Sequence, residues 1–169
     1  MASVLKVDTL QSLTGVTRSN VLQFKTATSS GRQTIASTGM VNITGLSIAI
    51  TPQSSTSLIL VQGAVVFSNS YVLSLAVLKN GSKTLTDDGG TNNNEANVQW
   101  TYYEGDNDGY LTGAHPIFHH ETAGNTTART YTIAAGSAWS GSANTMYVNN
   151  RSSNDMASLS YMYVWEIAQ

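Results

Sequence analysis

The sequence predicts an all-β protein: an antiparallel β-sandwich or jelly roll of about ten strands with a short N-terminal arm. Ser and Thr each occur 21 times among the 169 residues, with 14 Asn, 14 Gly and 2 Pro. This composition is typical of strands joined by polar turns, whereas a helical bundle is rich in Glu, Lys, Leu and Ala. Short apolar runs alternate with a period of two, and no window carries a 3.6-residue amphipathic pattern.

The chain divides into an N-terminal arm, residues 1–20, and a head domain, residues 21–169. The arm carries one short strand-like run followed by a Gly turn, so we expect it to serve as an anchor. In the head, the apolar and turn residues predict strands at 21–28, two within 34–50, and then at 57–67, 71–78, 83–86, 98–103, 110–121, 128–134, 145–149 and 159–167.

Three of these elements carry specific signals. Residues 57–67 are almost all apolar and rich in β-branched side chains, which favours a strand buried on both faces. Asn80-Gly81 between apolar runs predicts a tight hairpin, because both residues tolerate a positive φ. Pro116 has no backbone N–H, so its strand is expected at a sheet edge or at a bulge.

Composition and charge exclude several classes of function. Charged residues make up 11% of the chain, against about 25% in an average domain. The 8 Lys and Arg are scattered and the net charge is −2, so no nucleic-acid partner is expected. Without Cys there is no disulfide framework or thiol nucleophile. No apolar window is long enough for membrane insertion. Either hydroxyl and amide groups hydrate the surface, or an oligomer hides much of it.

Four stretches of the sequence form a recognisable set: residues 5–11 (LKVDTLQ), 43–52 with 57–61 (ITGLSIAITP, SLILV), 77–81 (VLKNG) and 163–169 (YVWEIAQ). In their order and spacing they resemble tail-fibre-like virion structural proteins of marine and cyanobacterial phages. The resemblance implies a homotrimeric jelly roll of the tumour-necrosis-factor-like kind at the outer end of a virion fibre or spike. It also implies host-surface recognition there, with the arm bound to other virion proteins.

The last strand provides the expected trimer interface. The resemblance places the terminal strand near the threefold axis, and aromatic residues are favoured at interfaces. One face of this strand carries Tyr161, Tyr163 and Trp165, and the other carries Met162 and Val164. Either face could pack at the axis. The alternative is that all five side chains belong to the core of one subunit.

A second group of residues suits a host glycan or protein receptor. Flat aromatic faces cover the C–H surface of sugars, while nearby amides and carboxylates bind hydroxyl groups. If the chain binds a receptor, the candidates are Trp100, Tyr102, Tyr103, Tyr110 and Trp139, together with Asn93, Asp106 and Asp108. The alternative is that these aromatics are core residues and the loops are inert.

Metal binding, cofactors and catalysis are not expected. Glu104, Asp106 and Asp108 alternate as calcium ligands do, but the twelfth position is His115 and no helices flank the loop. In a strand, His115 and His119 share a face and His120 points away, which suits surface hydrogen bonding better than a metal. No nucleophile motif or recognisable carboxylate pair indicates an enzyme.

Three functional hypotheses follow. The first is a phage virion structural protein acting as a homotrimeric tail-fibre or spike head in host attachment. The second is a trimeric capsid decoration, or cement, protein anchored by its arm. The third and weakest is a glycan-degrading enzyme.

Overall fold

The computed structural model describes residues 21–69, 72–84, 98–101, 112–136, 138–139, 142–143, 145–151 and 153–169, with the backbone alone at 69, 72, 73, 98–101, 138, 139, 142 and 143. The described residues form thirteen strands and no helix, so none of their elements could cross a membrane as a helix. All strand pairs are antiparallel. The predicted all-β class is therefore confirmed, while the expected arm, residues 1–20, lies outside the described residues.

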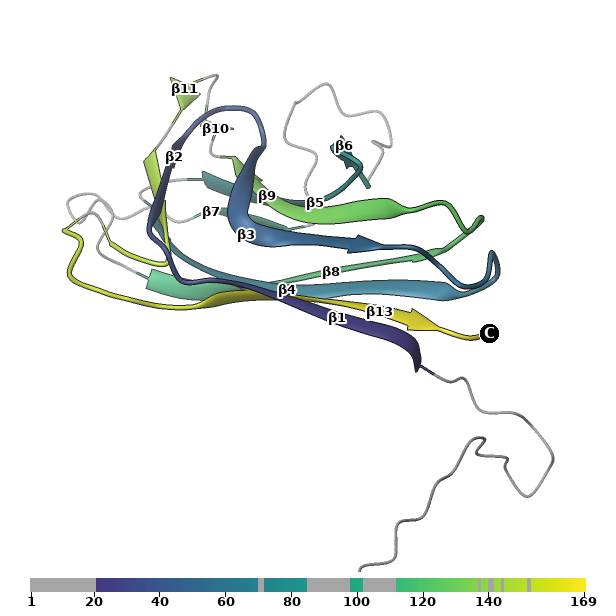
Figure 1. Cartoon of the computed structure of the whole chain (residues 1–169). Helices are drawn as coiled ribbons and strands as arrows, with labels where there is room; N and C mark the ends of the chain where they lie inside the picture. The colour runs from purple at the N-terminus through teal and green to yellow at the C-terminus, as the bar shows by residue number, and fades with distance from the viewer. Residues whose placement is uncertain are drawn as a thin grey trace, which may run out of the picture.

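The first sheet has strand order β1-β13-β4-β12-β2, with β8 on the other edge of β4 (Figure 1). Its strands are β1 (Val21–Ser29), β2 (Gln33–Ala36), β4 (Leu58–Asn69), β8 (Thr112–Thr122), β12 (Thr145–Val148) and β13 (Ser160–Ile167). β12 and β13 pair in succession along one edge of β4, so they act as one long strand interrupted after Val148. β1 and β2 continue one another in the same way.

The second sheet has strand order β3-β9-β5-β6, with β7 also paired to β5. Its strands are β3 (Val41–Ile50), β5 (Val72–Lys79), β6 (Ser82–Lys83), β7 (Val98–Thr101) and β9 (Arg129–Gly136). A separate hairpin joins β10 (Ala138–Trp139) to β11 (Ser142–Ala143).

This connectivity is that of a jelly roll. Along the chain, β1/β2 leads to β3 in the opposite sheet, and β4 returns to the first sheet before β5 crosses again. After β6 and β7, β8, β9 and β12/β13 alternate between the sheets in the same way. Each sheet is therefore four positions wide, which is the double-sheet arrangement of eight-position jelly rolls. The expected β-sandwich is confirmed.

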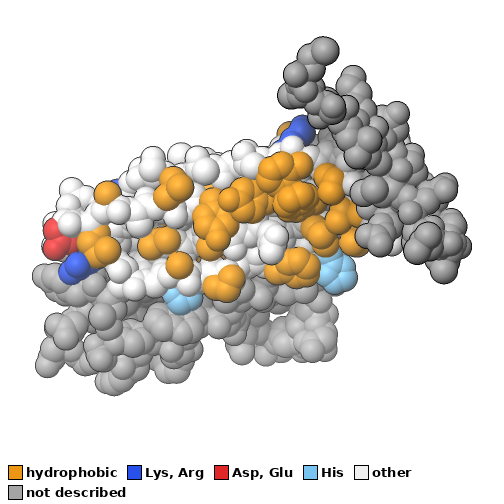
Figure 2. Space-filling view, turned by 90° about the horizontal axis from the view of Figure 1, so that it is seen from below, with side chains coloured by type: hydrophobic (Ala, Val, Ile, Leu, Met, Phe, Trp, Pro, Cys, Tyr) orange, Lys and Arg blue, Asp and Glu red, His pale blue; other side chains and the backbone are white. Residues whose placement is uncertain are grey.

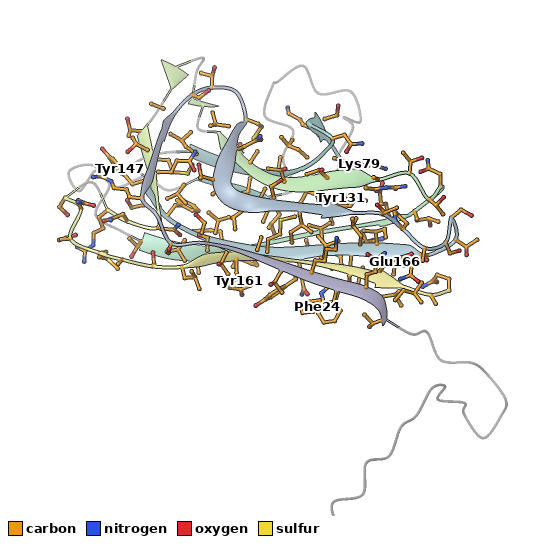
Figure 3. The ribbon with its side chains drawn as sticks, viewed as in Figure 1. Phe24, Lys79, Tyr131, Tyr147, Tyr161 and Glu166 are labelled. Carbon is orange, nitrogen blue, oxygen red and sulfur yellow. The ribbon has the colours of Figure 1, made fainter. Side chains whose placement is uncertain are left out.

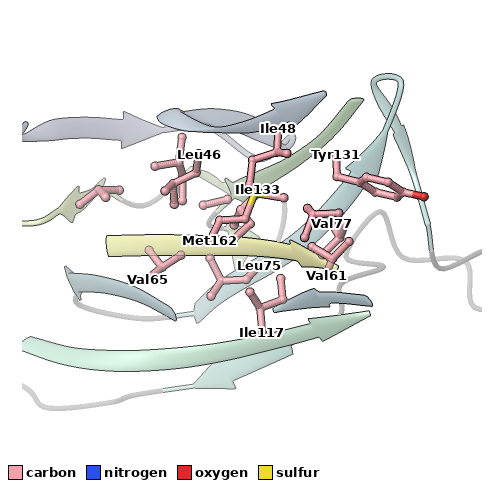
Figure 4. Close-up of a cluster of buried hydrophobic side chains, with 14 of the residues drawn as sticks. Leu46, Ile48, Val61, Val65, Leu75, Val77, Ile117, Tyr131, Ile133 and Met162 are labelled. Atoms are coloured by element: carbon pink, nitrogen blue, oxygen red, sulfur yellow. The ribbon is translucent and has the colours of Figure 1, made fainter. Parts of the chain in front are cut away.

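The hydrophobic core lies between the two sheets (Figure 4). In the strands that line the core, buried apolar residues recur at alternate positions, as Ile59 and Val61 do in β4 and Met162 and Val164 in β13. Ile48, Leu75, Ile133, Val65 and Met162 are each at most 5% exposed.

Two local predictions are confirmed at strand ends and edges. Lys79 pairs with Ser82 across Asn80-Gly81, and both turn residues have positive φ values, 52° and 83°. Within the described part of the chain β8 pairs with β4 alone, so Pro116 lies in an edge strand. There its missing N–H removes a donor that could otherwise recruit a foreign strand.

A buried carboxylate closes one end of the sandwich. Glu166 on β13 points inward and is 0% exposed. Its carboxylate accepts hydrogen bonds from Gln53 N (2.7 Å), Ser54 N (3.2 Å) and Gln23 Nε2 (2.6 Å). Burial alone would raise the pKa of Glu166, but donors from the turn after β3 and from Gln23 lower the pKa below its ordinary value.

Candidate functional site

The outward side of the first sheet carries a group of large apolar side chains, which we call the aromatic face. Tyr161 and Phe24 point away from the second sheet (Figure 3). Phe24 is 48% exposed, Phe118 51% and Tyr161 37%, although they belong to three different strands. The outward-pointing large apolar residues of β1, β4, β8 and β13 are Val21, Phe24, Leu58, Leu60, Val66, Phe118, Tyr161, Tyr163, Trp165 and Ile167.

Ring contacts join the aromatic residues of β1 and β13 into one row. The ring centroid of Phe24 lies 4.1 Å from that of Trp165 and 5.7 Å from that of Tyr163. The centroids of Tyr161 and Tyr163 are 5.2 Å apart. Because each ring is held by its neighbour, the row loses little side-chain entropy when another surface covers it.

The alternation of β13 decides which of its two faces is available to a partner. Tyr161, Tyr163 and Trp165 point outward, whereas Met162 and Val164 are 0% exposed and pack between the sheets. The expectation that Met162 and Val164 could pack at a trimer axis is therefore corrected. These two side chains already fill the core and are unavailable at the surface.

Phe24 and Phe118 are aromatic members of the aromatic face that the sequence pattern did not single out, and Phe24 shows why. Its neighbours Gln23 and Lys25 point the other way: Lys25 Nζ donates to Ala49 O (2.7 Å) and Gln23 Nε2 to Thr51 O (2.7 Å). The polar side of β1 thus lies over the neighbouring edge of the second sheet, and its apolar side faces outward. The sequence shows the period-two pattern of β1, but it does not show which side of the strand faces the core.

The aromatic face also explains the apolar run of β4. Val61 and Val65 are 0% exposed, but Leu60 and Val66 on the outward side are only half-buried and Gln62 is exposed. The expectation that both faces of this strand are buried is wrong for the outward one, because no described element covers it. The uniform apolar run reflects an uncovered sheet face rather than a double-sided core.

The aromatic face carries no formal charge. Figure 2 views this side of the sandwich, where hydrophobic side chains gather in the middle and Asp, Glu, Lys and Arg stay at the margins. The outward positions of β1, β4, β8 and β13 contain none of these four residue types. His120 is exposed among these outward positions, and its ring centroid lies 5.8 Å from that of Phe118.

Of the candidate receptor residues, the structure places only two, and only by their backbone. Trp100 lies in β7, opposite Leu73 of β5, and Trp139 lies in the β10–β11 hairpin. The remaining candidates lie outside the described residues; they are Asn93, Tyr102, Tyr103, Asp106, Asp108 and Tyr110.

The histidines are arranged as the alternation of β8 predicts. His115 and His119 are half-buried on the inward side and His120 is exposed on the outward side. Burial lowers the pKa of His115 and is also the main cause of the lowered pKa of His119. Within the described ranges no three His, Cys, Asp or Glu side chains gather as a metal site. Glu104, the first residue of the proposed calcium loop, lies outside those ranges.

Beside His119, Glu121 joins both sheets in an ionic cluster. Its carboxylate accepts hydrogen bonds from Lys79 Nζ (2.8 Å) and the Tyr131 hydroxyl, with Arg129 Nη1 3.6 Å away. Burial alone would raise the pKa of Glu121, but its bonds to Lys79 and Tyr131 lower it below the ordinary value. Burial and the bond to Glu121 raise the pKa of Tyr131. With donors on both oxygens, this carboxylate is suited to fastening β5, β8 and β9 rather than to proton transfer.

Comparisons with known proteins find distant structural likenesses and no match in sequence. No family model matches the chain, and no curated protein does. Among solved structures, the chain is similar to one titled "Structure of infectious bursal disease virus Gt strain", at 12% identity and a TM-score of 0.40. The match covers 98% of this chain and 42% of that one, so this chain spans less than half of its neighbour's length.

Proposed function

We propose that this chain is a structural protein of a phage virion. Its jelly-roll head forms a homotrimer through the aromatic face and serves as a tail-fibre or spike head for host attachment. The observation that carries the proposal is the uncharged aromatic face on one sheet of the sandwich. The four stretches that resemble phage tail-fibre-like proteins supply the virion context.

The chemistry of the face favours a second copy of the same chain as its partner. Contiguous exposed apolar surface marks an interaction site, and burying it gains about 25 cal/mol per Å². A face without formal charge meets its own copy without like-charge repulsion. Aromatic side chains such as Phe24, Tyr163 and Trp165 are also enriched in the buried centres of interfaces.

Trimer formation would give the head its function through avidity. Three identical recognition sites on one particle raise the effective concentration for the second and third contacts. The binding surface then needs only weak affinity at each site. The arm, residues 1–20, would connect each copy to a neighbouring virion protein; it joins the head at Val21, which pairs with Ile167 near the chain's other end.

The oligomeric state and the location in the virion test the two parts of this proposal. Multi-angle light scattering of the purified chain should give three times the monomer mass. Gold-tagged antibody on intact virions should label the tail periphery. A monomer at micromolar concentration would contradict the assembly. Label spread over the capsid would instead favour the decoration-protein hypothesis, and absence of label from virions would overturn the virion role.

A further inference from the structure

A hollow lined mainly by polar residues opens at one edge of the sandwich, and its lining includes no residue of the core cluster and no aromatic ring. Its volume is about 330 Å³, within the range of small-ligand sites. It lies between the β1–β2 junction and the irregular stretch of β3. Its lining includes the exposed hydroxyl residues Thr28, Ser30 and Thr44, together with Arg32 and Gln33.

A buried amide fixes the wall of the hollow on the β1–β2 side. Asn149 is 1% exposed and has a positive φ of 59°. Its Nδ2 donates to the backbone oxygens of Ser29 (2.8 Å) and Gly31 (3.1 Å), and its Oδ1 accepts from the Ser160 hydroxyl (2.6 Å). A junction that could otherwise move is therefore held in one conformation.

A second amide and a glycine fix the wall on the β3 side. Gln33 Nε2 donates to Asn42 O (2.9 Å), and Gln33 Oε1 accepts from Thr44 N (2.8 Å). Gly45 has a φ of +87°, and a Cβ there would lie 2.8 Å from Thr28 O. Glycine is therefore required where the two walls meet. Both walls are set before any ligand arrives, which reduces the entropy cost of binding.

The lining favours a hydroxylated ligand with a negative charge. Hydroxyl side chains both donate and accept, as sugar hydroxyls do. Arg32 is the one charged residue of the lining, and its guanidinium lies 4.9 Å above the Tyr147 ring, which orients it. A guanidinium has five N–H donors in a planar fork, so it can contact the protein and a ligand carboxylate at once.

We infer that this hollow binds a carboxylate-bearing saccharide, such as a uronic-acid unit of a host-surface polysaccharide. The inference rests on the proposed function and adds the chemical class of the receptor and its place on the head. Arg32 binds the carboxylate, and the hydroxyls of Ser30 and Thr44 bind the sugar hydroxyls.

Calorimetric titration of the full chain with trigalacturonate and with neutral maltotriose tests this inference. We expect trigalacturonate to bind with a Kd of about 1 mM or tighter, and maltotriose more weakly. Arg32→Gln should weaken trigalacturonate binding about tenfold, because it removes the charged fork. Lys25→Gln removes the same charge from a part of β1 outside the hollow, and it should leave the affinity for trigalacturonate unchanged. Thr44→Val should weaken binding of both sugars.

Three results would overturn the inference: no heat with trigalacturonate, an affinity unchanged by Arg32→Gln, or equal losses in Arg32→Gln and Lys25→Gln. The last result would mean that only diffuse charge attracts the sugar. None of them would affect the trimer mass or the labelling of virions, so failure of this site is distinguishable from failure of the proposed function.

Discussion

Strand β13 and residues 46–50 of β3 both alternate strictly, yet they present opposite kinds of outer side chain. The inward residues of β3, such as Ile48 and Ile50, are at most 5% exposed, and its outward residues include Ser47 and Ala49, which are exposed and small. β13 also buries its inward residues, but its outward ones are aromatic. In both strands one face packs into the core, and the strands differ only in the side chains of the outer face.

The difference shows how an interaction surface can be recognised on a sheet. An outward face in water gains nothing from large apolar side chains, so small polar residues suffice there, as on β3. Aromatic residues on an outward face indicate a partner. β13 is moreover an interior strand, between β1 and β4, so its row of rings lies within the sheet rather than at its rim.

A Lys placed on the outer face of β13 and one placed on the outer face of β3 should differ most in their effect on assembly. Trp165→Lys puts an unpaired ammonium into the proposed interface, which should weaken assembly by about 4 kcal/mol. Ala49→Lys adds the same charge to the outer side of β3 and should leave assembly unchanged. Sedimentation at several concentrations measures both. Equal trimer stability in the two variants would contradict the assignment of the aromatic face.

Truncations on the two sides of β13 should separate core from surface. Met162→Ala removes a fully buried side chain and should lower the free energy of unfolding by about 3 kcal/mol. Tyr161→Ala should cost well under half of that in the monomer, because Tyr161 is 37% exposed. Both truncations are made in a protein that also carries Trp165→Lys, which is expected to prevent assembly. Urea unfolding then measures the stability of the monomer alone. Similar losses in the two variants would mean that Tyr161 is part of the core.

Local patterns in the sequence predict most of the fold. The Asn80-Gly81 turn, the edge position of Pro116 and the alternation of β8 all depend on backbone rules that act over a few residues. Alternation also separates the two faces of β13. It does not say which face is inward, because Met162 and Tyr161 are both acceptable core residues.

The parts that escaped prediction depend on contacts between distant segments. Phe24 faces outward because Gln23 and Lys25 reach across to the end of β3, and no local pattern specifies that crossing. The two backbone N–H groups that donate to Glu166 come from a turn more than 100 residues earlier in the chain. The hollow depends on Asn149, which anchors a junction near residue 30.

Glu166 is the charged residue on the inward side of β13, and replacing it should lower the free energy of unfolding by an intermediate amount. Glu166→Gln keeps the shape but offers an N–H to donors, so unfolding free energy should fall by about 2 kcal/mol near pH 7. The folded-state pKa of Glu166 is lowered. Its contribution to the free energy of unfolding is therefore present above the unfolded-state pKa and is lost as the pH falls through the folded-state pKa.

The pH dependence supplies the check on Glu166. The gap in unfolding free energy between wild type and Glu166→Gln should narrow as pH is lowered below about 4. Glu121 also has a lowered pKa, but it titrates in both proteins and cancels from the difference. A gap that stays constant from neutral to acidic pH would show that the charge of Glu166 contributes nothing.

The smallest expected effect concerns the β5–β6 turn on the second sheet. Gly81 has a φ of +83°, and a Cβ there would meet no atom within 4 Å. Gly81→Ala therefore carries only the conformational cost of a positive φ, about 1 kcal/mol. Gly39→Ala is the matched control, because Gly39 has an ordinary φ and its Cβ would lie 3.8 Å from Ser37 Oγ. Urea unfolding should separate the two variants, while the trimer mass should be the same in both, since neither position touches the aromatic face.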